Sequence, residues 1–214
     1  MLQKTTIEYH ALELLKALQA DNEFVQFHLA GGTGLALQLG HRLSVDLDLF
    51  TLNHFDSEQY LQHLEGKYQF NVDYSAVSTL KGSIGDIKVD FIAHPYKLIK
   101  PVVEIENIRL YSVADIAAMK VNAIAGNGTR SKDFVDLYFL LNHFTVQQIL
   151  DFYDVKYNGR NTLHALKSLN YFNDISLSDW PVLIDKKLTW NIIKATIDKH
   201  CKEYLKSIKP PGSA

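Results

Sequence analysis

The sequence contains few of the features that mark secreted, membrane or disulfide-stabilised proteins. Its 214 residues include a single cysteine, Cys201, which excludes an intramolecular disulfide framework and a cysteine-rich zinc site. The first twenty residues carry lysines and glutamates instead of the apolar core of a secretion signal, and no later stretch has the length of a membrane span. We therefore expect a cytoplasmic protein that does not act in a membrane.

A large net charge of one sign is also missing. The chain has 22 Lys and Arg residues against 24 Asp and Glu residues, so its formal net charge of -2 does not attract nucleic acid or anionic membranes. Contact with nucleic acid would need a local basic patch. The C-terminal half offers either such a patch or an ordinary solvated helix surface, and its basic residues are Lys156, Arg160, Lys167, Lys186, Lys187, Lys194, Lys199, Lys202, Lys206 and Lys209.

Hydrophobic periodicity predicts an α+β fold, in which a mixed β-sheet with flanking helices (residues 1–111) is followed by a helical C-terminal region (residues 112–214). Strand patterns are found at 24–30, 45–50, 68–74, 76–80 and 85–92. Helical patterns are found at 7–18, 33–38, 57–64, 115–125, 132–142, 146–152, 162–169 and 190–208. Thr33 is the expected N-cap of the second helix.

Two aspartates with one residue between them are the most informative feature. In a strand, Asp46 and Asp48 emerge on the same face, about 6 to 7 Å apart along the chain. Two such carboxylates, completed by substrate phosphates, suit a divalent cation such as Mg²⁺ or Mn²⁺. The spacing therefore predicts metal-dependent phosphoryl or nucleotidyl transfer, although an isolated pair of this kind also fits the solvated face of an edge strand.

A glycine turn and a third acid add to this pattern. Gly31 and Gly32 have no β-carbon, so their backbone N–H groups, with the hydroxyl of Thr33, can approach phosphate oxygens at a helix N-terminus. A bare tight turn is the alternative. Asp90 lies on another strand with clear alternation. If that strand is a neighbour of the first acidic strand, Asp90 completes a triad able to hold two metal ions and to activate a hydroxyl nucleophile.

Five further polar residues are candidates for the site, and four of them have two possible roles. Lys120 lies among apolar residues of a helix, so its ammonium either reaches solvent or points at an anion. Asp133 and Asp136 share a helix face, where they either serve the site or stabilise the helix through its dipole and a lysine pair. Arg42 either holds a phosphate or lies on the surface. Ser44 shares the strand face of the two acids and is a further candidate for nucleotide binding.

Together these motifs resemble the AbiEii/AbiGii toxin family, which belongs to the DNA polymerase β-like nucleotidyltransferase superfamily. The segments that carry the resemblance are 31–37, 41–50, 118–124 and 130–137. It extends from about residue 27 to residue 141, and the sequence from residue 144 onward is too variable to support an assignment.

The resemblance implies the nucleotidyltransferase fold, an NTP substrate with Mg²⁺, and a toxin role beside a separately encoded antitoxin in a bacterial or phage-defence system. Some similar proteins transfer nucleotides to RNA, notably to tRNA 3′ ends. The implied roles are triphosphate binding by Gly31, Gly32 and Thr33, metal binding by Asp46 and Asp48, phosphate contact by Lys120, and the family's last acidic position for Asp133 or Asp136. Asp90 follows from analogy with the superfamily, and the helical region would complete the active-site cleft.

Three functions follow from these residues. The first is an Mg²⁺-dependent nucleotidyltransferase. The second is a non-catalytic interaction module that keeps the fold and works through a protein partner, and the third is a metal-dependent phosphoester hydrolase in which the same carboxylates direct water.

Overall fold

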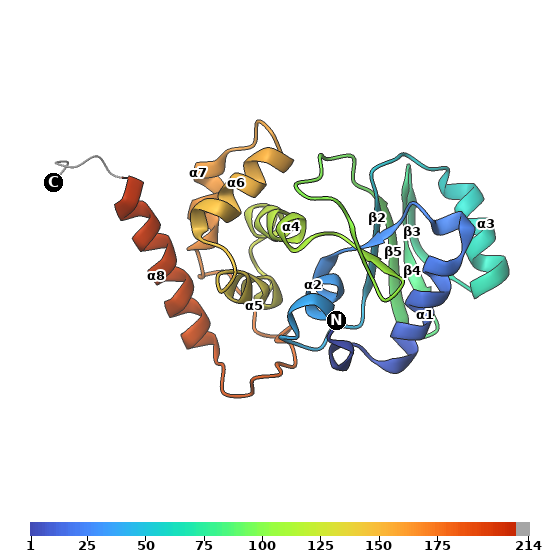
Figure 1. The fold of residues 1–214 in the computed structure, drawn as a ribbon, viewed down its shortest axis with the longest axis horizontal. Coiled ribbons are helices and arrows are strands. Elements are labelled where there is room, and N and C mark those ends of the chain that lie inside the picture. The colour runs from blue at the N-terminus through green and yellow to red at the C-terminus, as the bar shows by residue number, and fades with distance from the viewer. Residues whose placement is uncertain (209–214) are drawn as a thin grey trace. The chain divides into compact units, whose positions relative to one another are not determined.

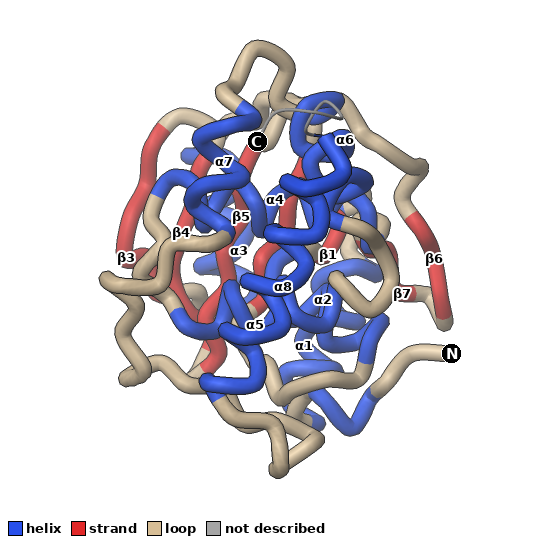
Figure 2. The backbone as a smooth tube through the Cα atoms, turned by 90° about the vertical axis from the view of Figure 1, so that its left-hand side faces the viewer, coloured by secondary structure: helices blue, strands red, loops and turns tan. Residues whose placement is uncertain are grey.

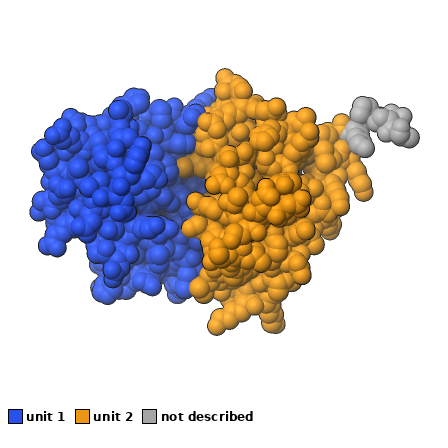
Figure 3. All heavy atoms as spheres, turned by 180° about the vertical axis from the view of Figure 1, so that it is seen from behind, with its two compact units in different colours: residues 1–116 blue, residues 117–214 orange. Residues whose placement is uncertain are grey.

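The computed structural model describes residues 1–208 and has the predicted α+β architecture. The chain divides into two compact units, Met1–Ile116 and Ala117–Ala214, which Figure 3 shows in different colours. The division falls inside helix α4 (Val113–Gly126).

The first unit contains a seven-stranded mixed sheet with the strand order β3-β4-β5-β2-β1-β7-β6. Figure 2 labels all of these strands except β2. The strands are β1 (His28–Leu29), β2 (Leu47–Thr51), β3 (Asn71–Ala76), β4 (Thr79–Ile84), β5 (Ile87–Ala93), β6 (Val103–Ile105) and β7 (Ile108–Leu110). The pairs β2–β5 and β1–β7 are parallel, and the other neighbours are antiparallel.

Alternation along the central strands separates an apolar face of the sheet from a more polar one. Leu47 and Leu49 of β2 are buried together with Val89 and Phe91 of β5. They share a hydrophobic core with the buried leucines of α1 (Tyr9–Ala20) and with Leu64 of α3 (Ser57–Tyr68). Helices α1 and α3 therefore cover the apolar face, and α2 (Gly31–Leu39) lies on the other side of the sheet (Figure 1).

The second unit is helical, as the sequence predicts. Its helices after α4 are α5 (Ser131–Leu140), α6 (Val146–Lys156), α7 (Thr162–Leu169) and α8 (Trp190–Ile208). The side chain of Thr145 caps α6 in a reciprocal capping box with Gln148, and Asn161 caps α7. None of the helices in residues 1–208 is both long and apolar enough to cross a membrane.

Several predicted boundaries are wrong. The expected strand at 24–30 is a 3-10 turn, η2 (Asn22–Phe24), followed by the two-residue strand β1, because Asp21 caps the turn by accepting a hydrogen bond from the Glu23 amide. The expected strands at 68–74 and 76–80 lie further along the chain, as β3 and β4, since α3 continues to Tyr68. The hairpin of β6 and β7 and the short 3-10 helix η1 (Lys4–Thr6) were not predicted.

Candidate functional site

Asp48 and Asp90 are neighbours across two parallel strands. In the pairing of β2 with β5, Asp48 is the register partner of Asp90, so the two side chains leave the same face of the sheet. The strand adjacency on which the prediction for Asp90 depended is therefore present. Asp46 lies one residue before β2 begins, so the expected alternation along a strand does not include it. Asp46 is held instead by a hydrogen bond from the hydroxyl of Thr33 to its backbone carbonyl.

The glycine turn lies against the first of these acids. Gly31 follows β1 and has a φ of 60°, a left-handed conformation that favours glycine. A β-carbon at Gly31 would overlap Oδ2 of Asp48, and one at Gly32 would overlap Nη2 of Arg42. Gly31 is therefore favoured both by its left-handed backbone and by the Asp48 carboxylate beside it, whereas at Gly32 the nearest atom is the end of the Arg42 side chain.

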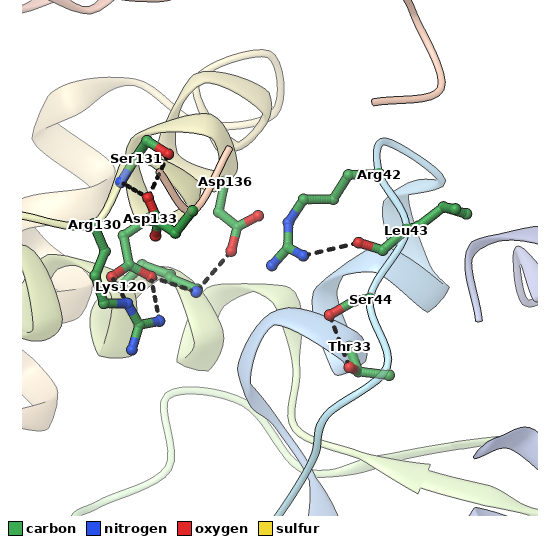
Figure 4. A network of polar contacts seen from close by, with 10 residues as sticks. Thr33, Arg42, Leu43, Ser44, Lys120, Arg130, Ser131, Asp133 and Asp136 are labelled. Carbon is green, nitrogen blue, oxygen red and sulfur yellow. Dashed lines mark hydrogen bonds and ion pairs between the residues drawn. The ribbon is translucent and has the colours of Figure 1, made fainter. Parts of the chain in front are cut away.

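Thr33 does not cap the helix as predicted. Helix α2 begins at Gly31 with Ala30 as its N-cap, so Thr33 lies inside the first turn. Its hydroxyl donates to the backbone carbonyl of Asp46 and lies 2.9 Å from Oγ of Ser44, as Figure 4 shows for the second contact. Thr33 and Ser44 therefore fasten the segment before β2 to the helix that follows the glycine turn.

Arg42 belongs to the interior and not to the surface. The residue is 4% exposed, and its Nη1 donates a hydrogen bond of 3.1 Å to the carbonyl of Leu43. The surface alternative for Arg42 is therefore wrong. A buried guanidinium beside Gly32 is a positively charged group at the turn, and such groups bind phosphate oxygens well.

Asp90 has a cationic neighbour that the sequence analysis missed. Lys81 of β4 is the register partner of Asp90, and its Nζ lies 2.8 Å from Oδ2 of Asp90. The signal for Lys81 was available, because the polar residues of β4 alternate with Leu80 and Gly82. The strand predicted at 76–80 ended at Leu80, so Lys81 lay outside it, whereas β4 continues to Ile84.

The carboxylates suit a hard divalent cation. Asp48 places its carboxylate next to the glycine turn, and Asp46, whose backbone carbonyl accepts a hydrogen bond from Thr33, lies two residues before it. Mg²⁺ commonly uses one or two carboxylates together with substrate phosphates. Within residues 1–208, no group of three or more His, Cys, Asp or Glu side chains is placed to hold a metal ion. A metal here would therefore depend on substrate oxygens as well as on protein ones.

The second unit holds a buried charge cluster of its own, shown in Figure 4. Nζ of Lys120 on α4 lies 2.7 Å from Oδ1 of Asp133 and 2.7 Å from Oδ2 of Asp136, both on α5. Lys120 is 6% exposed and the two aspartates are at most 2% exposed. Of the two alternatives for Lys120, the one in which its ammonium reaches solvent is wrong, and the anions at which it points are these two carboxylates.

The start of α5 is tied down from both sides. Arg130 places Nε 3.1 Å from Oδ2 of Asp133, an ion pair without hydrogen-bond geometry, and donates from Nη2 to Oδ1. Asp179, far along the chain, accepts hydrogen bonds from the backbone N–H and the hydroxyl of Ser131, at 3.1 and 2.7 Å. Asp179 was not predicted, because no local pattern connects it with α5.

The basic C-terminal residues do not all reach solvent. Lys156 is 2% exposed, so it is no part of a basic surface. Lys202 pairs with Asp198 at 2.6 Å, and Lys209 lies outside the described residues. An RNA contact along this half stays a prediction.

Comparison with known proteins agrees with this geometry. The chain matches the family model described as "Nucleotidyl transferase AbiEii toxin, Type IV TA system" over residues 13–199. A protein of Aquifex aeolicus (strain VF5), aq_aa25, is 30% identical over 203 residues, which cover 92% of this chain and 95% of that protein.

Solved structures show the same fold. A putative nucleotidyltransferase from H. pylori matches with a TM-score of 0.55 and 15% identity, over 94% of this chain and 96% of that one. The antibiotic-resistance factor ANT(2'')-Ia matches with a TM-score of 0.52 and 13% identity, over 67% of this chain and 89% of its own. The predicted resemblance is confirmed: the chain is a nucleotidyltransferase and belongs to the AbiEii toxin family.

Proposed function

We propose that this nucleotidyltransferase moves a nucleoside monophosphate from an NTP to a hydroxyl of RNA, at a 3′ end, in a reaction that requires Mg²⁺. We further propose that it acts as the toxin of a toxin–antitoxin or phage-defence pair with a separate antitoxin. The observation that carries the first proposal is the contact of the glycine turn with Asp48, whose register partner is Asp90. An anion-binding turn and paired acids at one place suit a substrate that is both polyanionic and metal-bound.

The turn and its neighbours would bind the triphosphate. The backbone N–H groups at Gly31 and Gly32 would donate to phosphate oxygens at the start of α2, which contributes the positive end of a helix dipole. Arg42 would add charge-assisted hydrogen bonds. Thr33 and Ser44 would act mainly by holding the segment that carries Asp46.

Asp46 and Asp48 would hold the metal ion together with substrate phosphate oxygens, and Asp90, which lies 2.8 Å from Nζ of Lys81, would lie beside them without completing a three-carboxylate metal site. When bound, Mg²⁺ neutralises phosphate oxygens and favours departure of pyrophosphate. In the transfer, the acceptor oxygen forms a bond to the α-phosphorus, the bridging P–O bond to the β-phosphate breaks, and its electron pair leaves with pyrophosphate. Asp90 would accept the proton of the acceptor hydroxyl.

The family resemblance assigns Lys120 a phosphate contact. The two carboxylates that hold its ammonium support positioning roles for Asp133 and Asp136, since each lies 2.7 Å from Nζ of Lys120.

The experiment is to incubate the protein with each NTP, labelled at the α-phosphate, together with Mg²⁺ and total cellular RNA. Label joined to RNA that chelation of Mg²⁺ abolishes is the expected result. Free labelled nucleotide without joined label would support phosphoester hydrolysis, and no product with any NTP would support an interaction module. Label joined to protein and not to RNA would show that the acceptor is a protein.

The toxin proposal is tested separately, by controlled expression. Growth arrest that accompanies labelling of cellular RNA is expected from the active protein. Normal growth at high levels of active protein would contradict the toxin role, but it would not contradict the proposed transfer reaction.

A further inference from the structure

A row of paired residues extends from the acids toward one edge of the sheet. Asp48 of β2 pairs with Asp90 of β5, Asp90 pairs with Lys81 of β4, and Lys81 pairs with Tyr74 of β3. Register partners project from the same face of a sheet, so the four side chains form one line across four strands. With strands about 4.8 Å apart, Tyr74 lies about 14 Å from Asp48 along that line.

The outer part of this row is accessible. The side chain of Lys81 is 44% exposed and Tyr74 is 55% exposed. The adjacent residues Leu80 and Phe91 are fully buried on the opposite face, against α1 and α3. Lys81 has three N–H donors and gives one to Asp90. The row therefore presents an ammonium and an aromatic ring that the core does not require.

A β-bulge in β3 places two residues, Asp73 and Tyr74, opposite Lys81. The register shifts between Val72 and Tyr74, so Asp73 is the extra residue of β3. Two residues of a bulged strand oppose one residue of its partner, which places Asp73 beside Tyr74 and opposite Lys81. Asp73 is exposed and brings a negative charge to the end of the row.

The row and the glycine turn lie on opposite sides of β2, and this indicates which of the two substrates the row contacts. In the strand order, β1 and the turn that follows it lie on one side of β2, whereas β5, β4 and β3 lie on the other. In phosphoryl transfer the attacking and leaving oxygens are in line on opposite sides of the phosphorus. If the turn takes the triphosphate, the acceptor approaches Asp48 from the side of Asp90, Lys81 and Tyr74.

We infer that Lys81 and Tyr74 bind the 3′-terminal segment of a single-stranded RNA acceptor, with Lys81 on a backbone phosphate and Tyr74 stacked on a base. Stacking on exposed aromatic rings together with lysine contacts is the usual way in which proteins hold unpaired strands. The distance of Tyr74 from Asp48 assigns it a base upstream of the terminal nucleotide. The inference rests on the proposed function for the identity of the acceptor.

Two variants with opposite expected effects test the inference. Binding of a fluorescent single-stranded RNA is measured without NTP or Mg²⁺. Tyr74→Ala should weaken binding roughly 5- to 150-fold, the range for loss of one stacked base. Asp73→Asn should tighten binding, because it removes a negative charge that faces the RNA phosphates. Tyr9→Ala is the matched control, since Tyr9 is a 71% exposed tyrosine on α1, which covers the other face.

A third variant tests the lysine. Lys81→Gln should lower the salt dependence of RNA binding by about one phosphate contact, that is, by a log–log slope of about 0.7, the value per contact on a single strand. The control is Lys16→Gln, because Lys16 has a similar exposure of 42% and also pairs with an acid, but lies on α1. Its slope should equal that of the parent.

Kinetics separate failure of this inference from failure of the proposed function. In the transfer assay, Tyr74→Ala should raise the KM for RNA and leave the KM for NTP unchanged. If label is joined to RNA but Tyr74→Ala and Asp73→Asn bind RNA as the parent does, the inference is wrong and the proposed function stands. If no label reaches RNA and protein is labelled instead, the RNA acceptor is wrong and the inference falls with it.

Discussion

Gly31 and Asp48 are in contact at the point where the sheet meets α2, and the contact exists only because residue 31 has no side chain. Gly31 also has a left-handed backbone conformation, with a φ of 60°. The turn therefore depends on glycine twice, once for its backbone and once for the carboxylate beside it.

These two requirements can be separated with a second glycine. Gly85, in the turn before β5, has a φ of 57°, but a β-carbon there would meet no atom within 4 Å. We expect Gly85→Ala to lower the free energy of unfolding by about 1 to 2 kcal/mol, the cost of a left-handed alanine, and to keep transfer activity. Gly31→Ala should cost more stability and also abolish transfer, because it displaces Asp48. Denaturant unfolding and the labelling assay measure the two effects.

Equal loss of activity in both glycine variants would mean that general instability, and not the contact with Asp48, limits the reaction. If Gly31→Ala keeps its transfer activity, the glycine turn is not part of the active site.

Lys120 provides a prediction about stability. Replacing Lys120 with Met leaves Asp133 and Asp136 buried without their shared cation, so we expect a loss of about 3 to 5 kcal/mol in the free energy of unfolding. Adding Asp136→Asn should recover part of that loss, because one uncompensated charge is then removed. Urea unfolding of the two variants and the parent measures the difference.

The matched control for Lys120 is an exposed pair. Lys199 lies 3.9 Å from Glu203 on α8 and is 72% exposed, so Lys199→Met should change stability by less than about 1 kcal/mol. A loss of similar size in Lys120→Met would contradict the account of a buried and tightly held cluster.

Asp21 predicts how stability responds to acid. Burial opposes ionisation of Asp21, but hydrogen bonds from His63, Lys67 and Tyr68, each 2.8 Å long, outweigh it and hold the pKa below the ordinary 3.8. A carboxyl with a lowered folded-state pKa stabilises the fold above its unfolded pKa, and the contribution is lost as pH falls through the folded value.

The midpoint of urea unfolding should therefore fall as the pH is lowered from about 5 toward about 2.5, and the fall should be shallower in Asp21→Asn. Asp86→Asn, at an exposed turn position, should keep the slope of the parent. Identical slopes in the parent and Asp21→Asn would show that this cluster does not couple folding to protonation.

The helices of the second unit and the face pattern of β2 and β5 could be predicted because each depends on local periodicity. Thr162–Leu169 and Trp190–Ile208 have the bounds that their apolar spacing indicates. The hairpin of β6 and β7 was missed, although its residues alternate, because both strands have three residues and the turn between them uses Glu106 and Asn107 with positive φ.

The candidate site was predictable in its residue types and not in its arrangement. Alternation shows which face of its strand Asp90 occupies. The neighbour of a strand is decided by packing between distant segments, so the sequence could not show that Asp90 pairs with Asp48, and the predicted role of Asp90 had to assume it. The partners of Lys120 could not be found for the same reason, because the helix period places Asp133 and Asp136 on one face without showing which helix they meet.

The central claim is that Asp48 is a catalytic carboxylate of a nucleotidyl transfer, and one measurement tests it most directly. Transfer of α-labelled nucleotide to RNA is compared for Asp48→Asn, for the exposed control Asp86→Asn and for the parent, with folding checked by thermal unfolding. Loss of a charge-stabilising group in a preorganised site costs roughly 10²- to 10³-fold in rate. The account predicts a folded Asp48→Asn protein with at least that loss and an Asp86→Asn protein as active as the parent. An Asp48→Asn protein that labels RNA at the parent's rate would contradict it.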